Sequence, residues 1–322
     1  MCSDPAEAAR WSSSSRVGRW WVARLMPGGL RRSIIGVLPL VLAAVMGLTG
    51  CSALRIGYGQ APDLIYWWLD RYVDFDGDQT VRVRAAIADW FAWHRRTQLP
   101  EYADLLVRAQ REVLADTTPG RVCEWQREFV RRARVAYEQA EPAAADIVLT
   151  ISAEQIRQLE KRYAKNNDEF RDEYLQADPA QRQKKNLERT VDRAEILYGR
   201  LEDGQRARLA DALARSPFDP GLWLAEREQR QQDALRLLRA MSNGDGAANR
   251  EQAAAALRGY ADRLERSPRE AYRHYNDRLV EYNCGVLAAL HNSTTPAQRR
   301  TAAKKLAGWE SDLRFIVAQA QR

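Results

Sequence analysis

The sequence predicts an all-α protein, a multi-helix bundle of roughly eight to ten helices in one domain. Two observations predict this fold. Apolar residues recur three or four positions apart in almost every segment after Cys51, and this is the period of an amphipathic helix. Strand-like content is confined to residues 147–151, and one short run cannot make a sheet.

The first segment of the chain is expected to be an export signal. An uncharged apolar run covers residues 34–48, follows Arg31-Arg32 and leads into Leu48-Thr49-Gly50-Cys51. A cationic start, an apolar core and small residues before the cut are typical of a secretory signal peptide. Because the site ends in cysteine, it resembles the lipobox of bacterial lipoproteins. That resemblance implies a signal peptide over residues 1–50 and a lipid, with palmitate, on Cys51.

The alternative is an uncleaved membrane anchor. The run of fifteen residues is short of the roughly 20 that a spanning helix needs, and Pro39 interrupts it. The start also stays open, because initiation at Met26 would leave a signal peptide of ordinary length. Ser52, rather than Asp, follows the cysteine, so we expect an outer-membrane lipoprotein that faces the periplasm.

Most of the positive charge lies before Cys51. The whole chain has 50 Lys+Arg against 43 Asp+Glu, and the segment before Cys51 holds six arginines and two acids. The mature chain therefore carries 44 basic and 41 acidic residues, a net charge of +3. Nucleic-acid binding needs a concentrated basic face, so we expect no nucleic-acid partner.

The helical domain is expected over residues 63–322, after a lipidated N-terminus and short spacer over 51–62. Breaks are expected at Leu99-Pro100, at residues 216–220 and at residues 243–246, where turn residues gather. The clearest apolar stripes are Val83, Ile87, Trp90 and His94; Tyr102, Leu105, Ala109 and Val113; Leu187, Val191, Ala194 and Leu201; Tyr272, Tyr275, Leu279, Tyr282, Val286 and Leu290; and Ala302, Leu306, Trp309, Leu313, Ile316 and Ala320.

The helix starts share a capping sequence in which Ser, Thr, Asp or Glu stands three positions before Gln. Physically this is a capping box. The side chain of the first residue accepts a hydrogen bond from the backbone amide of Gln, and the Gln side chain accepts one from the backbone amide of the first residue. Each box is worth about 1 kcal/mol. Ser267 to Glu270 is the same device with Glu. The five glutamines are Gln79, Gln155, Gln181, Gln205 and Gln298.

Two cysteines remain in the mature chain beside Cys51, namely Cys123 and Cys284. In an exported protein the simplest expectation is that they pair, and the long loop so closed would contribute on the order of 5 kcal/mol. The alternative is two unrelated buried thiols. A disulfide would pack early helices against late ones, which favours one domain.

No motif for a metal or cofactor is present. Residues 74–78 alternate carboxylates like a calcium loop, but Gln79 stands where glycine is required and Ala85 where a bidentate glutamate is required. The three histidines, His94, His274 and His291, lack metal-binding spacing. We therefore expect no cofactor and no metal site.

An enzyme acting on envelope lipid or glycan is the alternative to a binding protein. Helical proteins can assemble carboxylates from distant helices. This hypothesis requires Asp70, Asp74, Asp76 and Glu101 to meet in one pocket with His94. Without such convergence the sequence gives no catalytic residues, and the protein is more simply not an enzyme.

Four residues are expected to form a partner surface: Trp67, Trp68, Arg227 and Arg230. Trp67 and Trp68 stand close to the lipidated cysteine, so they could instead rest at the membrane interface. Asn166-Asn167 interrupts a regular helix, where it would either fix helix register as a buried polar pair or form the floor of a groove.

The mature chain resembles a group of uncharacterised Gram-negative lipoproteins of unknown function, over nearly all of its length. The similar segments are residues 66–70, 93–96, 99–103, 165–168 and 227–232, together with the lipobox. This resemblance implies a location and no activity.

The five capping sequences are also similar to the Leu-Thr-x-x-Gln repeat of the stress-induced periplasmic helical chaperones, which implies a holder of unfolded clients. None of the five is an identical match, and those chaperones are shorter and lack a lipid anchor. Capping chemistry alone would generate the pattern. The favoured hypothesis is thus an anchored lipoprotein that binds another envelope component, most simply a protein.

Overall fold

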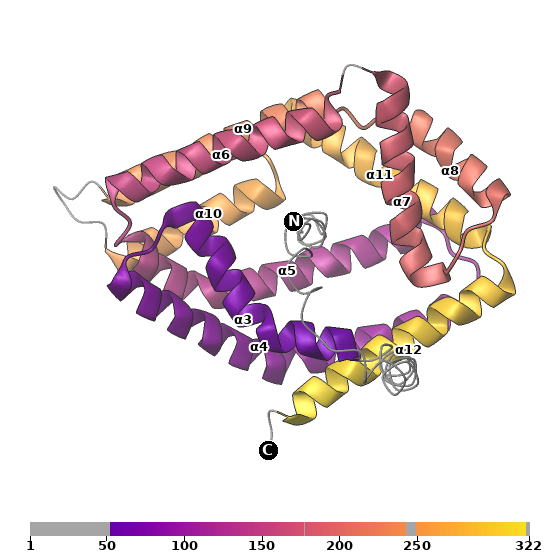
Figure 1. Cartoon of the computed structure of the whole chain (residues 1–322), viewed down its shortest axis with the longest axis horizontal. Helices are drawn as coiled ribbons and strands as arrows, with labels where there is room; N and C mark the ends of the chain where they lie inside the picture. The colour runs from indigo at the N-terminus through magenta and orange to yellow at the C-terminus, as the bar shows by residue number, and fades with distance from the viewer. Residues whose placement is uncertain (1–51, 177, 243–248, 320–322) are drawn as a thin grey trace, which may run out of the picture. The chain divides into compact units, whose positions relative to one another are not determined.

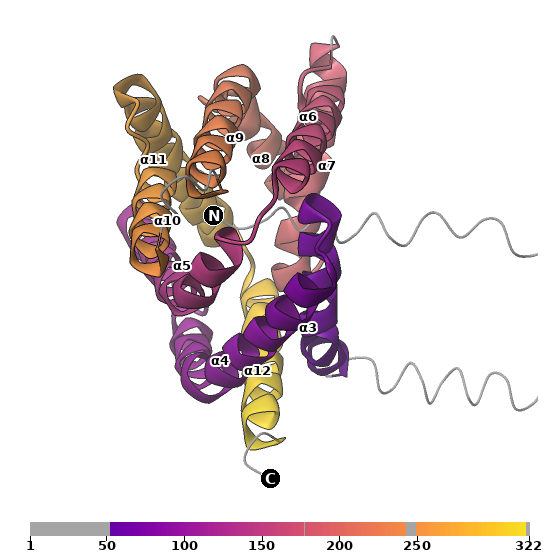
Figure 2. The same cartoon turned by 90° about the vertical axis from the view of Figure 1, so that its left-hand side faces the viewer.

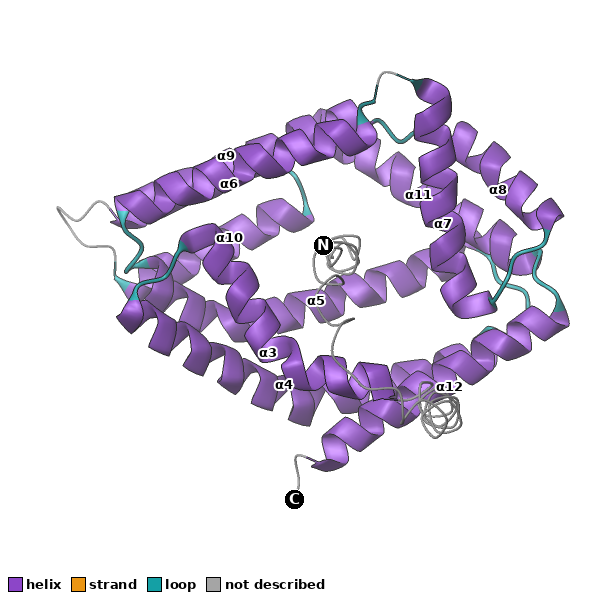
Figure 3. Ribbon diagram, viewed as in Figure 1, coloured by secondary structure: helices purple, strands orange, loops and turns teal. Residues whose placement is uncertain are grey.

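The computed structural model describes residues 52–176, 178–242 and 249–319. These residues form ten α-helices and no strand, so the all-α prediction and the helix number are confirmed (Figure 3). The helices are α3 (Ser52–Val73), α4 (Gly77–Glu112), α5 (Pro119–Val148), α6 (Ala153–Tyr174), α7 (Pro179–Tyr198), α8 (Asp203–Ala214), α9 (Pro220–Ser242), α10 (Arg250–Glu265), α11 (Glu270–Asn292) and α12 (Pro296–Gln319).

The chain divides into two compact units, Met1–Ala53 and Leu54–Arg322. The signal peptide over 1–50, the alternative start at Met26, the lipidation site Cys51 and the turn at 243–246 lie outside the described residues. The second unit holds the helical domain.

Helices far apart in the sequence pack side by side in the second unit. Helix α12 lies along α4, α5 packs against α4, α10 and α11, and α6 packs against α9 (Figure 1). Helix α7 contacts α8 and α12, and α8 contacts α11. Figure 2 shows α3, α6 and α7 on one flank of this unit and α10 and α11 on the other. Early and late helices are thus interleaved.

The prediction that a helix ends at Leu99-Pro100 is wrong, because α4 runs without interruption from Gly77 to Glu112. Leu99 and Ala103 are buried against Leu313 and Ile316 of α12. A proline inside a helix costs about 3 kcal/mol, and burying several apolar side chains along one helix face offsets that cost. Tertiary packing therefore overrides the local signal.

The spacer expected over 51–62 is also corrected, because residues 54–62 belong to α3. Tyr58 packs against the buried cluster of α4 and α12, and its ring contacts Phe91 edge-on with centroids 5.4 Å apart. Arg55 donates to Asp312 at 2.5 Å. These contacts hold the segment as helix despite two glycines.

Two pairs of capping glutamines join helix turns to one another. Gln79 and Gln155 each stand in the first turn of a helix. The Nε2 of Gln79 donates to the Oε1 of Gln155 at 3.2 Å, and the Nε2 of Gln155 donates to the Oε1 of Gln79 at 2.5 Å. Gln79 also donates to the Thr150 carbonyl at 2.8 Å, and Gln155 to the Asp74 carbonyl at 3.0 Å. Each glutamine thus satisfies an open carbonyl at the end of another helix.

The same joint occurs a second time. Gln205 and Gln298 exchange amide hydrogen bonds at 2.8 and 2.9 Å. Gln205 donates to the Ser293 carbonyl at 2.8 Å, and Gln298 to the Arg200 carbonyl at 2.9 Å. The fifth glutamine, Gln181, is exposed.

The capping sequence at Ser267 does not act as predicted, because α11 begins at Glu270. Ser267 is buried, and its hydroxyl contacts the Glu226 carboxylate and accepts from the Arg269 amide at 3.2 Å. The hydroxyl thus holds the turn before α11, and the helix itself begins three residues later. A tertiary contact again overrides the local signal for where the helix begins.

The structure contains the disulfide between Cys123 of α5 and Cys284 of α11, which closes 161 positions of chain. It joins an early helix to a late one, as expected of a single domain. Cys284 itself is buried.

Candidate functional site

The acids that an enzyme would need do not converge. Asp70 accepts from the Phe75 amide at 3.0 Å, and Asp76 caps α4 through the Gln79 amide at 2.8 Å, so both hold the turn between α3 and α4. Glu101 lies some seven turns further along α4, about 37 Å away on a straight helix, and pairs with Arg132 on α5 at 2.7 Å. These carboxylates are used to build the fold.

His94 lies among aromatic rings. Its imidazole stacks on Trp90 with centroids 4.7 Å apart, and Nδ1 is 3.0 Å from the Tyr58 hydroxyl. Burial lowers the pKa of His94 to about 4. A neutral imidazole in such surroundings acts as a packed aromatic side chain.

This pKa predicts a pH dependence of stability. The unfolded state binds a proton at His94 near pH 6.5 and the folded state only near pH 4, so the free energy of unfolding falls as pH drops through this window, by about 1 kcal/mol per pH unit. Above pH 6.5 the stability is complete. In urea titrations between pH 4 and 7, His94→Phe should flatten this slope.

His274→Phe is the matched control for that measurement, since the His274 ring is exposed. Its slope should equal that of the wild-type protein. Equal slopes for wild type and His94→Phe would contradict the assignment.

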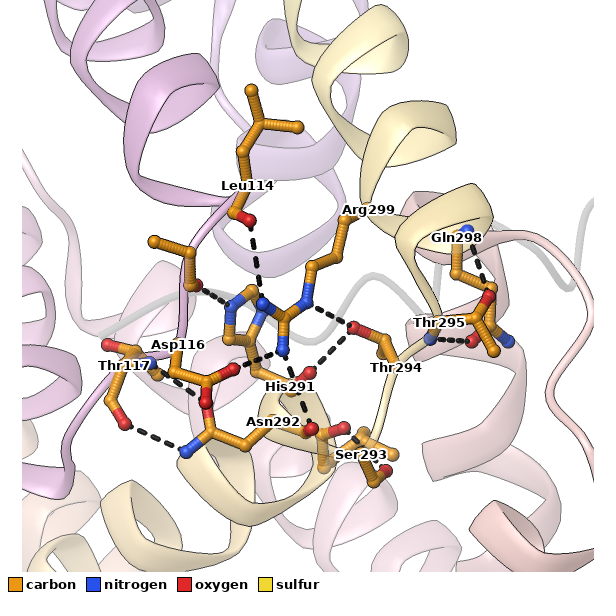
Figure 4. Close-up of polar contacts among 12 residues, drawn as sticks. Leu114, Asp116, Thr117, His291, Asn292, Ser293, Thr294, Thr295, Gln298 and Arg299 are labelled. Carbon is orange, nitrogen blue, oxygen red and sulfur yellow. Dashed lines mark hydrogen bonds and ion pairs between the residues drawn. The ribbon is translucent and has the colours of Figure 1, made fainter.

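His291 lies in a network of hydrogen bonds that joins the turn after α4 to the turn before α12 (Figure 4). Nε2 lies 2.7 Å from the Ala115 carbonyl, which can only accept, so this nitrogen donates. Nδ1 lies 2.8 Å from the Tyr198 hydroxyl. Arg299 bonds Asp116 and, at 3.2 Å, the Thr294 hydroxyl. Both ring nitrogens of His291 are therefore engaged in holding loops together.

No group of three or more His, Cys, Asp or Glu side chains in the described ranges is arranged to hold a metal ion. None of the described helices is both long and apolar enough to cross a bilayer. A hollow of about 240 Å³ lies around Trp125 on α5, and its arginines Arg121 and Arg131 already pair with Glu124 and Glu128.

The strongest candidate for a binding site is a row of rings and guanidinium groups on α3, α6 and α9, which we call the aromatic–arginine band. Phe170 stacks on Trp223 with centroids 4.7 Å apart, and Arg227 lies 5.6 Å over the Trp223 ring. At the other end, Arg162 lies 5.4 Å over the Tyr72 ring. The band comprises Tyr72, Arg162, Tyr163, Phe170, Trp223 and Arg227.

Tyr163 connects the two ends of the band. Its ring centroid lies 6.4 Å from that of Tyr72, and the positive charge of Arg227 acts on its hydroxyl. Burial is the larger effect and raises the pKa of Tyr163 well above its usual range. The phenol therefore stays protonated and able to donate at neutral pH.

Buried amides lie under the band. Asn167 and Gln231 exchange hydrogen bonds at 2.7 and 3.0 Å, which fixes the register of α6 against α9. Asn166 donates to the Tyr72 hydroxyl at 2.6 Å, yet its Oδ1 is buried without a hydrogen-bond partner among the described residues, as is Nε of Arg162. Asn166 is only 4% exposed. Asn167 thus fixes the register of the two helices, and the side-chain oxygen of Asn166 is enclosed under the band.

The four residues expected at a partner surface lie on two helices, α3 and α9. Trp67 and Trp68 are 59% and 43% exposed on α3, and Trp68 contacts Tyr72 of the band with ring centroids 4.9 Å apart. Arg227 lies in the band. The Arg230 side chain is 11% exposed, pairs with buried Glu226 on the same helix at 2.8 Å and lies 5.5 Å over the Tyr272 ring of α11, so it supports the packing of α9 against α11.

Sequence reasoning missed five members of the band as site residues: Tyr72, Arg162, Tyr163, Phe170 and Trp223. The signal available was the spacing of Tyr163, Asn166 and Phe170, which places rings and an amide on one face of a helix. Their partners on α3 and α9 follow no local pattern.

A family model described as a family of unknown function (DUF6279) matches residues 71–253, more than half of the chain. The match covers every residue of the band. Neither the comparison with curated proteins nor the comparison with solved structures finds a match.

Proposed function

The chain belongs to the DUF6279 family of unknown function, and we propose that it is an envelope lipoprotein that binds another envelope protein. Lipid on Cys51 would hold it at the outer membrane, facing the periplasm. The lipobox at residues 48–51 supports this placement. The Cys123–Cys284 disulfide suits an oxidising compartment such as the periplasm.

The observation that carries the binding proposal is the aromatic–arginine band. Tyrosine, tryptophan and arginine are the residues enriched where binding energy concentrates at protein interfaces. Here they form one row whose members are only partly buried, with Phe170 beneath them. The guanidinium groups of Arg162 and Arg227 lie over ring faces of the same row and offer donors beside apolar surface. A protein segment supplies both the apolar groups and the acceptors that this row matches.

Photo-crosslinking in living cells tests the proposal. A photoreactive phenylalanine at position 223, inside the band, should give one discrete adduct with an envelope protein. The same residue at position 314, an exposed site on α12 outside the band, should not give that adduct. Identification of the adduct names the partner, and fractionation of the cells reports the membrane in which both reside.

Arg227→Ala should then weaken binding of the purified partner about tenfold, the loss typical of an interface arginine. Arg108→Ala is the matched control, because Arg108 lies 4.5 Å over the Trp125 ring in a similar contact outside the band. Adducts of equal yield at both crosslinking positions, or equal affinities for the two variants, would contradict the proposal. Suppression of client aggregation by both variants alike would favour the chaperone alternative.

A further inference from the structure

Helix α3 has one packed face and one open face. Its packed face carries Tyr58, Arg55 and Tyr66, which contact α4 and α12; Tyr66 is buried and its hydroxyl lies 2.9 Å from that of Thr80. The other side exposes six large apolar residues, which we call the outer face of α3: Leu54, Ile56, Leu64, Ile65, Trp67 and Trp68.

The apolar residues of the outer face form two groups along the helix, residues 54–56 and residues 64–68. Leu64, Trp67 and Trp68 are three and four positions apart and therefore adjacent on the surface, while Leu54 and Ile65, and likewise Ile56 and Trp67, are separated by three full turns. Asp63 borders this face and is paired with Arg84 at 2.8 Å. Six exposed apolar side chains on one short helix differ from the scattered single residues of an ordinary surface.

The segment before α3 indicates what covers the outer face of α3. On the proposed attachment, the chain is held at the membrane either by lipid on Cys51 after cleavage or by the apolar run of residues 34–48 kept as an anchor. Either form of attachment would bring residue 51 to the bilayer surface. Helix α3 begins at Ser52 with no linker between, so its first turn starts at that surface.

We propose that the outer face of α3 lies flat in the interfacial layer of the membrane that holds the N-terminus. Apolar residues lie both near the start of this face and about three turns further on, and a helix standing upright on the membrane would leave the second group in water. Trp67 and Trp68 are the residues that favour the headgroup level. The inference rests on the proposed membrane attachment at Cys51 and adds to it a second, non-covalent contact that fixes how the domain is oriented.

Fluorescence quenching tests this contact. The full chain, extracted from membranes and reconstituted into vesicles of phosphatidylcholine with bromine on the acyl chains, should show quenched tryptophan emission compared with unbrominated vesicles. In Trp67→Phe/Trp68→Phe the quenching should fall by about half or more, because the two indoles nearest the acyl chains are gone. Trp93→Phe/Trp309→Phe is the matched control, which removes two half-buried tryptophans and should keep the quenching.

Equal quenching in wild type and Trp67→Phe/Trp68→Phe would overturn the inference. Since both tryptophans are exposed, the variant is expected to keep the fold, and Trp67→Phe alone gives a second measurement. Incorporation of labelled fatty acid, abolished by Cys51→Ser, is scored separately. Labelled protein with equal quenching would leave the lipid anchor standing and reject the α3 contact, whereas unlabelled protein with a quenching difference would do the reverse.

Discussion

Replacing Gln205 by leucine is expected to lower the free energy of unfolding by about 3 kcal/mol. Gln205 is 1% exposed and donates to both Ser293 and Gln298, so the substitution leaves buried polar groups without partners. Leucine has a similar volume, and the loss is therefore one of hydrogen bonding. Urea titration followed by circular dichroism measures it.

Gln181→Leu is the control for that experiment. Gln181 occupies the same place in the same capping sequence, but its side chain is exposed. We expect a change within about 0.5 kcal/mol, as for other surface substitutions. Similar losses in the two variants would show that the capping sequence alone, and not the glutamine pair, provides the stability.

Removing the disulfide is expected to have a comparable or larger effect. In Cys123→Ala/Cys284→Ala the closed stretch of 161 positions becomes open in the unfolded chain, and the loop-entropy model gives a loss of about 5 kcal/mol. The measurement is again the urea midpoint, with and without a thiol reductant. The wild-type protein should lose stability on reduction, while the double variant should not respond.

A wild-type midpoint that reductant leaves unchanged, in protein whose thiols have been titrated as free, would contradict this prediction. It would mean that contacts between α5 and α11 suffice to hold the two helices together.

The helix content and most helix starts could be predicted because capping is a local property. Asp76, Ser152 and Thr295 make their predicted bonds to the amides of Gln79, Gln155 and Gln298. The partners of those glutamines could not be predicted, since they lie 76 and 93 positions away in the chain. The exposed Gln181 carries the same local sequence as the paired ones.

The predictions that failed also failed because of contacts between residues far apart in the sequence. Pro100 carries a clear local signal for a break, and burial of Leu99 against α12 overrides it. The band was missed for a related reason: Asn166 bonds Tyr72 across 94 positions, and Asn167 bonds Gln231 across 64. Periodicity indicates which face of a helix is packed, but it does not indicate which helix packs there.

The two glutamine joints are built in the same way. In the first half, Gln79 and Gln155 join the turn between α3 and α4 to the turn between α5 and α6, and in the second, Gln205 and Gln298 join the turn between α7 and α8 to the turn between α11 and α12. The halves differ in one respect: α4 leads directly into α5, whereas α9 and α10 stand between α8 and α11. Helix α9 carries Trp223 and Arg227 of the band. The candidate site therefore combines α3 and α6 of the first half with α9, a helix that stands outside both glutamine joints.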